Sequence, residues 1–120
     1  MKTELARLLA GSQGAFYLAT GVWPIIHLGS FEAVTGSKTD DWLVKTVGVL
    51  VAVVGLILLL AARHRRVTPE IALLGAGSAV GLATIDLVYA LSGVIAPIYL
   101  ADAVVEIGIA LLWAWSRGRG

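Results

Sequence analysis

The sequence predicts an all-α integral membrane protein, an antiparallel four-helix transmembrane bundle with both termini in the cytoplasm. Hydrophobic residues make up 58% of the 120 residues, charged residues make up 14%, and the mean hydropathy is +0.89. Soluble domains carry about 25% charged residues. Four long apolar stretches fill the chain, and a membrane-spanning helix needs roughly 20 such residues. We therefore expect one transmembrane domain, residues 1–120, and no soluble second domain.

Composition also excludes several classes of function. The formal net charge of +1 is too small to indicate nucleic-acid binding. The chain has no cysteine, which excludes disulfides, thiol catalysis and Cys-ligated metals. No nucleophile–base pair or glycine-rich phosphate loop stands out. No catalytic residue, metal or cofactor is therefore predicted.

The first helix is expected at residues 4–28. Lys2 and Arg7 precede its apolar run, which is also how a signal peptide begins. The run continues without an A-x-A-like cleavage site, so a retained helix is the favoured interpretation. Pro24 is expected to kink this helix or to end it early.

A loop rich in turn-forming residues is predicted at 29–41, with a short interfacial turn at 31–34. The second helix is expected at 41–62. Its candidate N-caps, where a carboxylate also suits the helix dipole, are Thr39, Asp40 and Asp41.

The third helix is expected at 69–91, because Thr68 is a good N-cap and Pro69 is tolerated at the first helical position. A tight basic turn, residues 63–66, precedes it. Pro97 opens the fourth helix, which is expected at 97–116. Short connections make sequential helices antiparallel neighbours.

Basic residues indicate the orientation in the membrane. Seven of the nine Lys and Arg residues share one side, and two lie on the other: Lys2, Arg7, Arg63, Arg65, Arg66, Arg117 and Arg119 against Lys38 and Lys45. The positive-inside rule then places both termini in the cytoplasm, with residues 63–66 near anionic membrane lipids. Trp23 and Trp42 are expected at the outer membrane interface, and Trp113 and Trp115 at the inner one.

Three carboxylates lie within the last two apolar stretches, and an intramembrane acid indicates a functional site. Asp86 shares a helix face with an alanine stripe, and Tyr99, Asp102 and Glu106 form a stripe on the fourth helix. Such stripes turn toward the interior of a bundle. The expected result is a polar pocket in the outer half of the bundle, with Glu106 at its floor and mostly small and aliphatic residues below.

The charges of this pocket do not balance. Lys45 is the one buried base expected there, and it is predicted to pair with Asp86 or Asp102. Two carboxylates then remain, so either two acids are protonated near neutral pH or a cation completes the site. A static network that fixes helix register is the alternative interpretation.

The full set of predicted ligand- or proton-binding residues comprises acids, one base and their hydrogen-bonding neighbours: Glu106, Asp102, Asp86, Lys45, Tyr17, Tyr89, Tyr99, Gln13, His27 and Glu32. Glu106 is assigned as the deep titrating acid, and the tyrosines as hydrogen-bond partners. The carboxylate spacing resembles that of a hard-metal site, but no metal is predicted.

A GxxxG motif, Gly77 to Gly81, points away from Asp86. Such motifs let two helices approach closely. The motif is expected either to pack against a helix of the same bundle or to form the seam of a homodimer.

One segment carries a family resemblance: Trp23-Pro24-x-x-His27-x-x-Ser30-Phe31-Glu32-x-x-Thr35-Gly36-x-Lys38-x-Asp40-x-Trp42-Leu43-Val44-Lys45. It resembles a signature of small bacterial four-helix membrane proteins that are DoxX-like in size and plan. The resemblance implies a bacterial cytoplasmic membrane location and transfers no activity. Small multidrug resistance transporters are a poorer match, because their essential first-helix glutamate has no counterpart here.

Three functions are therefore considered. The leading hypothesis is a protein that binds, and in one version transports, a proton, a cation or a small cationic or apolar ligand. The second is an accessory or structural subunit of a larger membrane complex. The third is a membrane enzyme acting on a lipid, with the carboxylates as acid–base groups.

Overall fold

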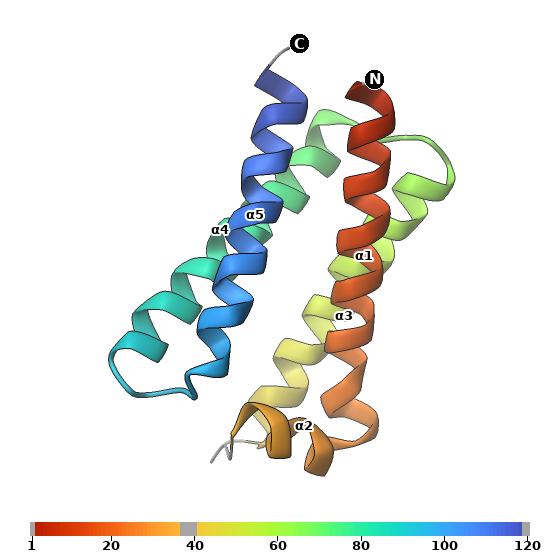
Figure 1. Cartoon of the computed structure of the whole chain (residues 1–120). Coiled ribbons are helices and arrows are strands. Elements are labelled where there is room, and N and C mark those ends of the chain that lie inside the picture. Colours follow the sequence, from red (N-terminus) through yellow and green to blue (C-terminus); the bar gives the residue numbers. More distant parts are fainter. Residues whose placement is uncertain (1, 37–40, 119–120) are drawn as a thin grey trace.

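A computed structural model describes residues 2–36 and 41–118, and this part of the chain is helical without strands (Figure 1). The helices in chain order are α1 (Lys2–Ile26), α2 (Leu28–Thr35), α3 (Asp41–Arg63), α4 (Pro69–Leu91) and α5 (Ile98–Gly118). The four predicted long helices are confirmed, with bounds within two residues of those expected.

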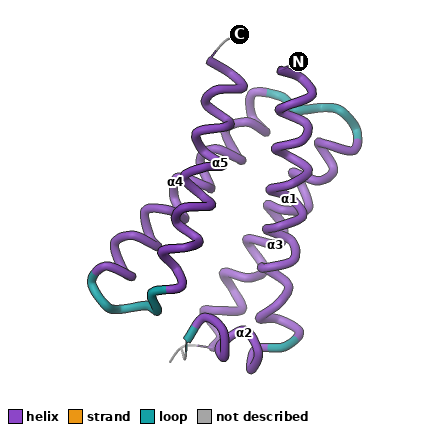
Figure 2. Tube along the Cα trace, viewed as in Figure 1, coloured by secondary structure: helices purple, strands orange, loops and turns teal. Residues whose placement is uncertain are grey.

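The helices form two hairpins. α1 packs along α3, α4 packs along α5, and α1 joins the two pairs through its contacts with α5 and α4 (Figures 1 and 2). The start of α1, the end of α5 and the turn between α3 and α4 lie at one end of the molecule. α2 and the α4–α5 connection lie at the other end.

Glycines hold α1 and α3 close together. Gly14 of α1 lies against Gly55 of α3, and Gly21 of α1 lies against Gly48 of α3. The two glycines on each helix are seven residues apart and so share one face of it. A Cβ at Gly14 would lie 2.7 Å from the Gly55 carbonyl oxygen, and one at Gly21 would lie 2.6 Å from that of Gly48. The backbones therefore touch, which is how membrane helices associate when apolar burial gives no driving force.

The region after α1 differs from the prediction. α1 continues two residues past Pro24, and then α2 occupies much of the predicted 29–41 loop. His27 caps α2, because its side chain accepts a hydrogen bond from the Ser30 backbone N–H at 3.1 Å. Trp23 donates its indole N–H to the Ser30 hydroxyl at 2.9 Å, which ties α2 back onto α1. The candidate caps at 39 and 40 lie outside the described residues.

The start of α4 agrees with the prediction. The Thr68 hydroxyl accepts a hydrogen bond from the Ile71 backbone N–H at 3.2 Å, and Pro69 is the first helical residue. This cap fixes where the second hairpin begins, and so sets which α4 residues face α1.

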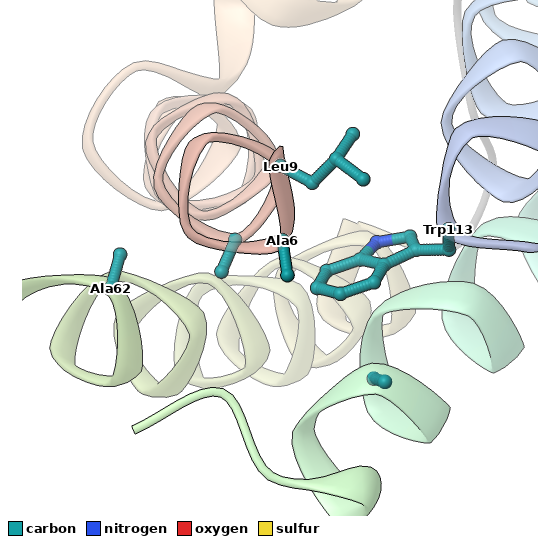
Figure 3. Close-up of a cluster of buried hydrophobic side chains, with 6 residues drawn as sticks. Ala6, Leu9, Ala62 and Trp113 are labelled. Atoms are coloured by element: carbon teal, nitrogen blue, oxygen red, sulfur yellow. The ribbon is translucent and has the colours of Figure 1, made fainter. Parts of the chain in front are cut away.

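The buried hydrophobic residues are mainly alanines, and Trp113 is the largest side chain among them. Ala10 and Ala79 are fully buried, and Trp113 is only 1% exposed. Trp113 packs beside Ala6 and Leu9 of α1 (Figure 3). The indole of Trp113 therefore fills the space between the hairpins that the small residues leave and is not exposed on the outer surface, whereas its predicted depth near the inner membrane interface stays a prediction.

The outer surfaces of α3, α4 and α5 are strongly apolar. All three helices are long and apolar enough to cross a membrane. Their exposed side chains include Leu50, Val53, Val80 and Val104, and exposed apolar patches on this scale mark a membrane or protein interface. These features make the chain a membrane protein. Among the described helices, α1 is as long but more polar and is not one of these three.

Candidate functional site

A row of polar side chains lies where α1 meets α4 and α5, and we call it the polar seam. The polar seam comprises seven residues with polar side chains and one glycine, Gly75, which lies against them: Gln13, Tyr17, Gly75, Ser78, Asp86, Asp102, Glu106 and Trp113. Gln13 and Tyr17 are four residues apart and therefore share one face of α1. Both are almost fully buried, at 2% and 1% exposed. On α1, Gly14 and Gly21 therefore face α3, whereas Gln13 and Tyr17 face the second hairpin.

Gln13 joins three helices. Its amide nitrogen donates to the Gly75 carbonyl oxygen at 2.9 Å, and its amide oxygen accepts from the Trp113 indole nitrogen at 2.7 Å. The amide nitrogen also lies 3.5 Å from the Ser78 hydroxyl oxygen. A buried amide is costly unless hydrogen-bonded, and both ends of this one have partners. Gln13 therefore fixes the register of the seam.

Gly75 makes room for this arrangement. A Cβ at this position would lie 2.6 Å from the Trp113 indole nitrogen and 2.9 Å from the Gln13 amide oxygen. Any larger residue would displace the indole or the amide. The close approach of α4 to the seam therefore depends on a residue without a side chain.

Tyr17 and Glu106 form the shortest polar contact between the hairpins. The Tyr17 hydroxyl donates to Glu106 Oε1 at 2.5 Å, and Glu106 is 1% exposed. Hydrogen bonds to an ionised acceptor are shorter and about twice as strong as neutral ones. This contact satisfies one oxygen of a carboxyl group that has almost no access to solvent.

Asp86, Asp102 and Glu106 form an acid cluster at the middle of the seam. Asp102 is an electrostatic neighbour of both Asp86 and Glu106. Asp86 is 5% exposed, and its Oδ2 is buried without a hydrogen-bond partner. Two adjacent carboxylates repel each other unless a proton or cation lies between them. The geometry therefore suits the binding of a small positive charge.

Lys45 does not neutralise this cluster. Its side chain is exposed, and it forms no ion pair within residues 2–36 and 41–118. The predicted pairing with Asp86 or Asp102 is wrong because α3 packs on α1 and barely contacts α4, so base and acids lie on different hairpins.

The other predicted site residues form none of the hydrogen bonds described above for the polar seam. His27 is exposed and caps α2, and Tyr89 is 42% exposed. Glu32 and Tyr99 are half-buried, on α2 and at the start of α5. Of the ten predicted residues, the structure brings together five: Gln13, Tyr17, Asp86, Asp102 and Glu106.

Three members of the polar seam were not predicted: Gly75, Ser78 and Trp113. Trp113 follows Glu106 by seven residues, which places both on one face of a helix. That spacing was a usable signal. The region below Glu106, expected to be aliphatic, instead holds the Gln13–Trp113 hydrogen bond.

Among the described residues, the arrangement does not form a metal site with three or more carboxylate or imidazole ligands. Within the described part of the chain, no three His, Asp or Glu side chains are grouped so that they could hold one. The Tyr99, Asp102 and Glu106 spacing therefore does not translate into a set of metal ligands.

The fold and the polar seam define the class, a small helical membrane protein with a buried acid cluster between two hairpins. Comparison with protein families, curated proteins and solved structures finds no match to this chain. The resemblance of residues 23–45 to DoxX-like proteins thus stays a prediction.

Proposed function

We propose that this protein lies in the bacterial cytoplasmic membrane and that α1 is its fourth span. The contacts between Gly14 and Gly55 and between Gly21 and Gly48 run α1 antiparallel along the apolar length of α3. A helix held this closely shares the depth of its neighbour in the bilayer. Its polar face is covered by α4 and α5, so Gln13 would not be exposed to lipid, where a polar side chain is costly.

The proposed orientation keeps both termini in the cytoplasm. Arg7, Arg63, Arg65 and Arg66 all lie at the end where α1 begins and α5 ends, and Lys45 lies toward the opposite end. This distribution is what the positive-inside rule favours.

We further propose that the acid cluster binds a proton or a small monovalent cation. The observation that carries this proposal is the buried Asp86 Oδ2, which has no hydrogen-bond partner among the described residues, in a carboxyl group whose electrostatic neighbours are the acids Asp102 and Glu106. An unpaired buried carboxylate oxygen is costly. A proton shared between Asp86 and Asp102, or a cation such as Na⁺ held by their oxygens, removes that cost.

Infrared difference spectroscopy of the protein in lipid vesicles tests the proposal. Raising the pH should remove a protonated-carboxyl band in the wild-type protein, and Asp86→Asn or Asp102→Asn should abolish that change. Adding Na⁺ at fixed pH should diminish the band if the cation competes with the proton. Glu70→Gln is the matched control, because Glu70 is an exposed acid in the first turn of α4.

The proposal fails if the band and its pH dependence are the same in Asp86→Asn, Asp102→Asn and Glu70→Gln. It also fails if neither pH nor Na⁺ alters a carboxyl signal in the wild-type protein. Uptake of protons or Na⁺ into the same vesicles then distinguishes transport from binding alone, with Glu106→Gln as the informative variant.

An accessory or homodimeric role is the second candidate, and the outer face of α4 favours it. Gly77 and Gly81 are exposed, and a Cβ at either position would meet nothing within 4 Å. Neither glycine packs against another described helix of this chain. Gly77→Leu should therefore disrupt assembly, measured by cross-linking in membranes, while leaving the infrared response of the acid cluster unchanged.

The lipid-enzyme hypothesis gains less support. Glu106 is 1% exposed and bonded to Tyr17. A catalytic acid must reach its substrate, and this carboxyl group is closed off from the surrounding lipid.

A further inference from the structure

A groove lies between the first turns of α1 and the last turns of α3, away from the polar seam. Its volume is about 400 Å³. Apolar, small and charged residues line it: Glu4, Arg7, Leu8, Gly11, Ser12, Leu59, Ala62 and Arg63. Its lining thus combines aliphatic side chains, Leu8 and Leu59, with two arginines and one acid.

Arg7 is held in place at this groove. Its Nε donates to the Ala62 carbonyl oxygen at 2.9 Å, which satisfies a carbonyl near the end of α3. A guanidinium group has five N–H donors, and this bond uses one. The other guanidinium nitrogens form no hydrogen bond with any described residue, so they are free to bind an anion.

The turn after α3 adds charge at the same end. Arg66 donates its backbone N–H to the Ala61 carbonyl at 2.9 Å and Arg65 donates to Ala62 at 3.3 Å, the bond pattern of a Schellman motif. Arg65 has a φ of 57°, a conformation in which glycine is the usual residue. The chain therefore places an arginine where the backbone alone favours glycine.

The depth of the groove suits a lipid headgroup. The apolar α3 ends at Arg63, and the Arg7–Ala62 bond sets Arg7 at the same level. Leu8 is 65% exposed beside it. Two arginines of the groove, Arg7 and Arg63, outnumber its one acid, Glu4, and neither forms an ion pair within the described residues. Arg65 and Arg66 add positive charge at the same end of the molecule, where Glu70 is the other acid.

We propose that this groove binds an anionic phospholipid, with the phosphate headgroup between Arg7 and Arg63 and an acyl chain along Leu8 and Leu59. Guanidinium groups pair with phosphate through two parallel hydrogen bonds, and basic pockets at the cytoplasmic ends of helices bind such headgroups. The site is separate from the acid cluster, so it does not depend on what that cluster binds; it rests on the proposed membrane location and orientation.

Native mass spectrometry of the purified full chain tests this proposal. With equal amounts of phosphatidylglycerol and phosphatidylcholine in the micelle, the wild-type protein should retain phosphatidylglycerol preferentially. Arg7→Gln and Arg63→Gln should each reduce that preference about fivefold, the usual effect of one basic residue at a charged membrane surface. Arg65→Gly removes a charge and places glycine at a backbone conformation that favours it. This variant should stay folded and should lose less of the phosphatidylglycerol preference than Arg7→Gln or Arg63→Gln.

Lys45→Gln is the matched control, because Lys45 is an exposed base on α3, the helix of Arg63, and lies near its other end. It should leave the preference unchanged. Equal retention of the two lipids by the wild-type protein would overturn the proposal, as would Arg63→Gln behaving like Lys45→Gln. Displacement of the lipid by inorganic phosphate alone would overturn the assignment to a phospholipid. Circular dichroism verifies that each variant is folded, and Arg63→Gln, at an exposed position, keeps the test decisive if Arg7→Gln unfolds.

Discussion

Replacing Gly55 by alanine should separate α1 from α3. The new Cβ would lie 2.5 Å from the Leu18 backbone nitrogen and 2.7 Å from the Gly14 carbonyl oxygen. Both are backbone atoms, so no side chain can rotate away. Relieving the contacts requires the helices to move apart by about 0.7–0.9 Å, a gap that forfeits roughly a quarter to a half of the dispersion energy of each contact.

The expected loss in the free energy of unfolding is about 1–3 kcal/mol, the usual cost of overpacking a close-packed interface. Gly77→Ala is the matched control. It makes the same chemical change within α4 at a position with nothing within 4 Å. Because alanine favours helix over glycine by about 1 kcal/mol, this variant should be neutral or stabilised.

Unfolding in mixed detergent micelles, followed by far-ultraviolet circular dichroism, measures both variants. Equal stability of Gly55→Ala and Gly77→Ala would refute the glycine contact between α1 and α3. Gly55→Ala being the more stable of the two would do so more strongly, since the new methyl group would then gain contacts instead of clashing with the α1 backbone.

Three further outcomes are expected. Gln13→Leu leaves the buried Trp113 indole N–H without its partner and removes one of the two side-chain hydrogen bonds to the Gly75 carbonyl, so it should lower the free energy of unfolding by about 1–3 kcal/mol; a neutral result in the same micelle assay would show that the seam is not held by this amide. Gly75→Ala should displace the Trp113 indole and weaken the near-ultraviolet circular dichroism signal, and an unchanged spectrum would contradict the close approach. Because the chain has no native cysteine, Arg65→Cys and Val94→Cys can be labelled singly in vesicles, and labelling of both from the same side would exclude the proposed orientation.

Helix positions were predictable because the signals for them are local. Thr68 before Pro69 marks the start of α4, and the apolar runs set the helix lengths. α2 was missed because its stabilising contacts come from side chains of its own neighbourhood, the His27 cap and the Trp23–Ser30 bond, in a segment whose composition is typical of a loop.

The acid cluster was predictable in part, for a different reason. Helical periodicity places Asp102 and Glu106 on one face whatever the tertiary structure. Helical periodicity does not say which helix a given face packs against, however, and the predicted pairing of Lys45 with an acid was wrong for that reason. The face of α3 that carries Gly48 and Gly55 did turn inward, but toward α1, so the lysine near its end stayed on the other hairpin.

The two hairpins are held together by different forces, and this bears on what the acid cluster can do. Within the first hairpin, Gly14 and Gly55 bring backbones into direct contact. Between the hairpins, Gln13 and Tyr17 of α1 form the hydrogen bonds of the polar seam. Burying apolar surface gives no driving force for helix association in lipid, so these few hydrogen bonds carry much of the specificity of docking.

The bond from Tyr17 to Glu106 therefore belongs both to the docking of the hairpins and to the acid cluster. Its strength depends on the charge of Glu106, because a neutral carboxyl is a weaker acceptor than a carboxylate. A proton or cation that enters beside Asp102 changes that charge or competes for the same oxygens. Occupancy of the cluster is thus coupled to the contact between the hairpins, and Tyr17→Phe, which removes the hydroxyl alone, should weaken that coupling while leaving the Gln13 contacts in place.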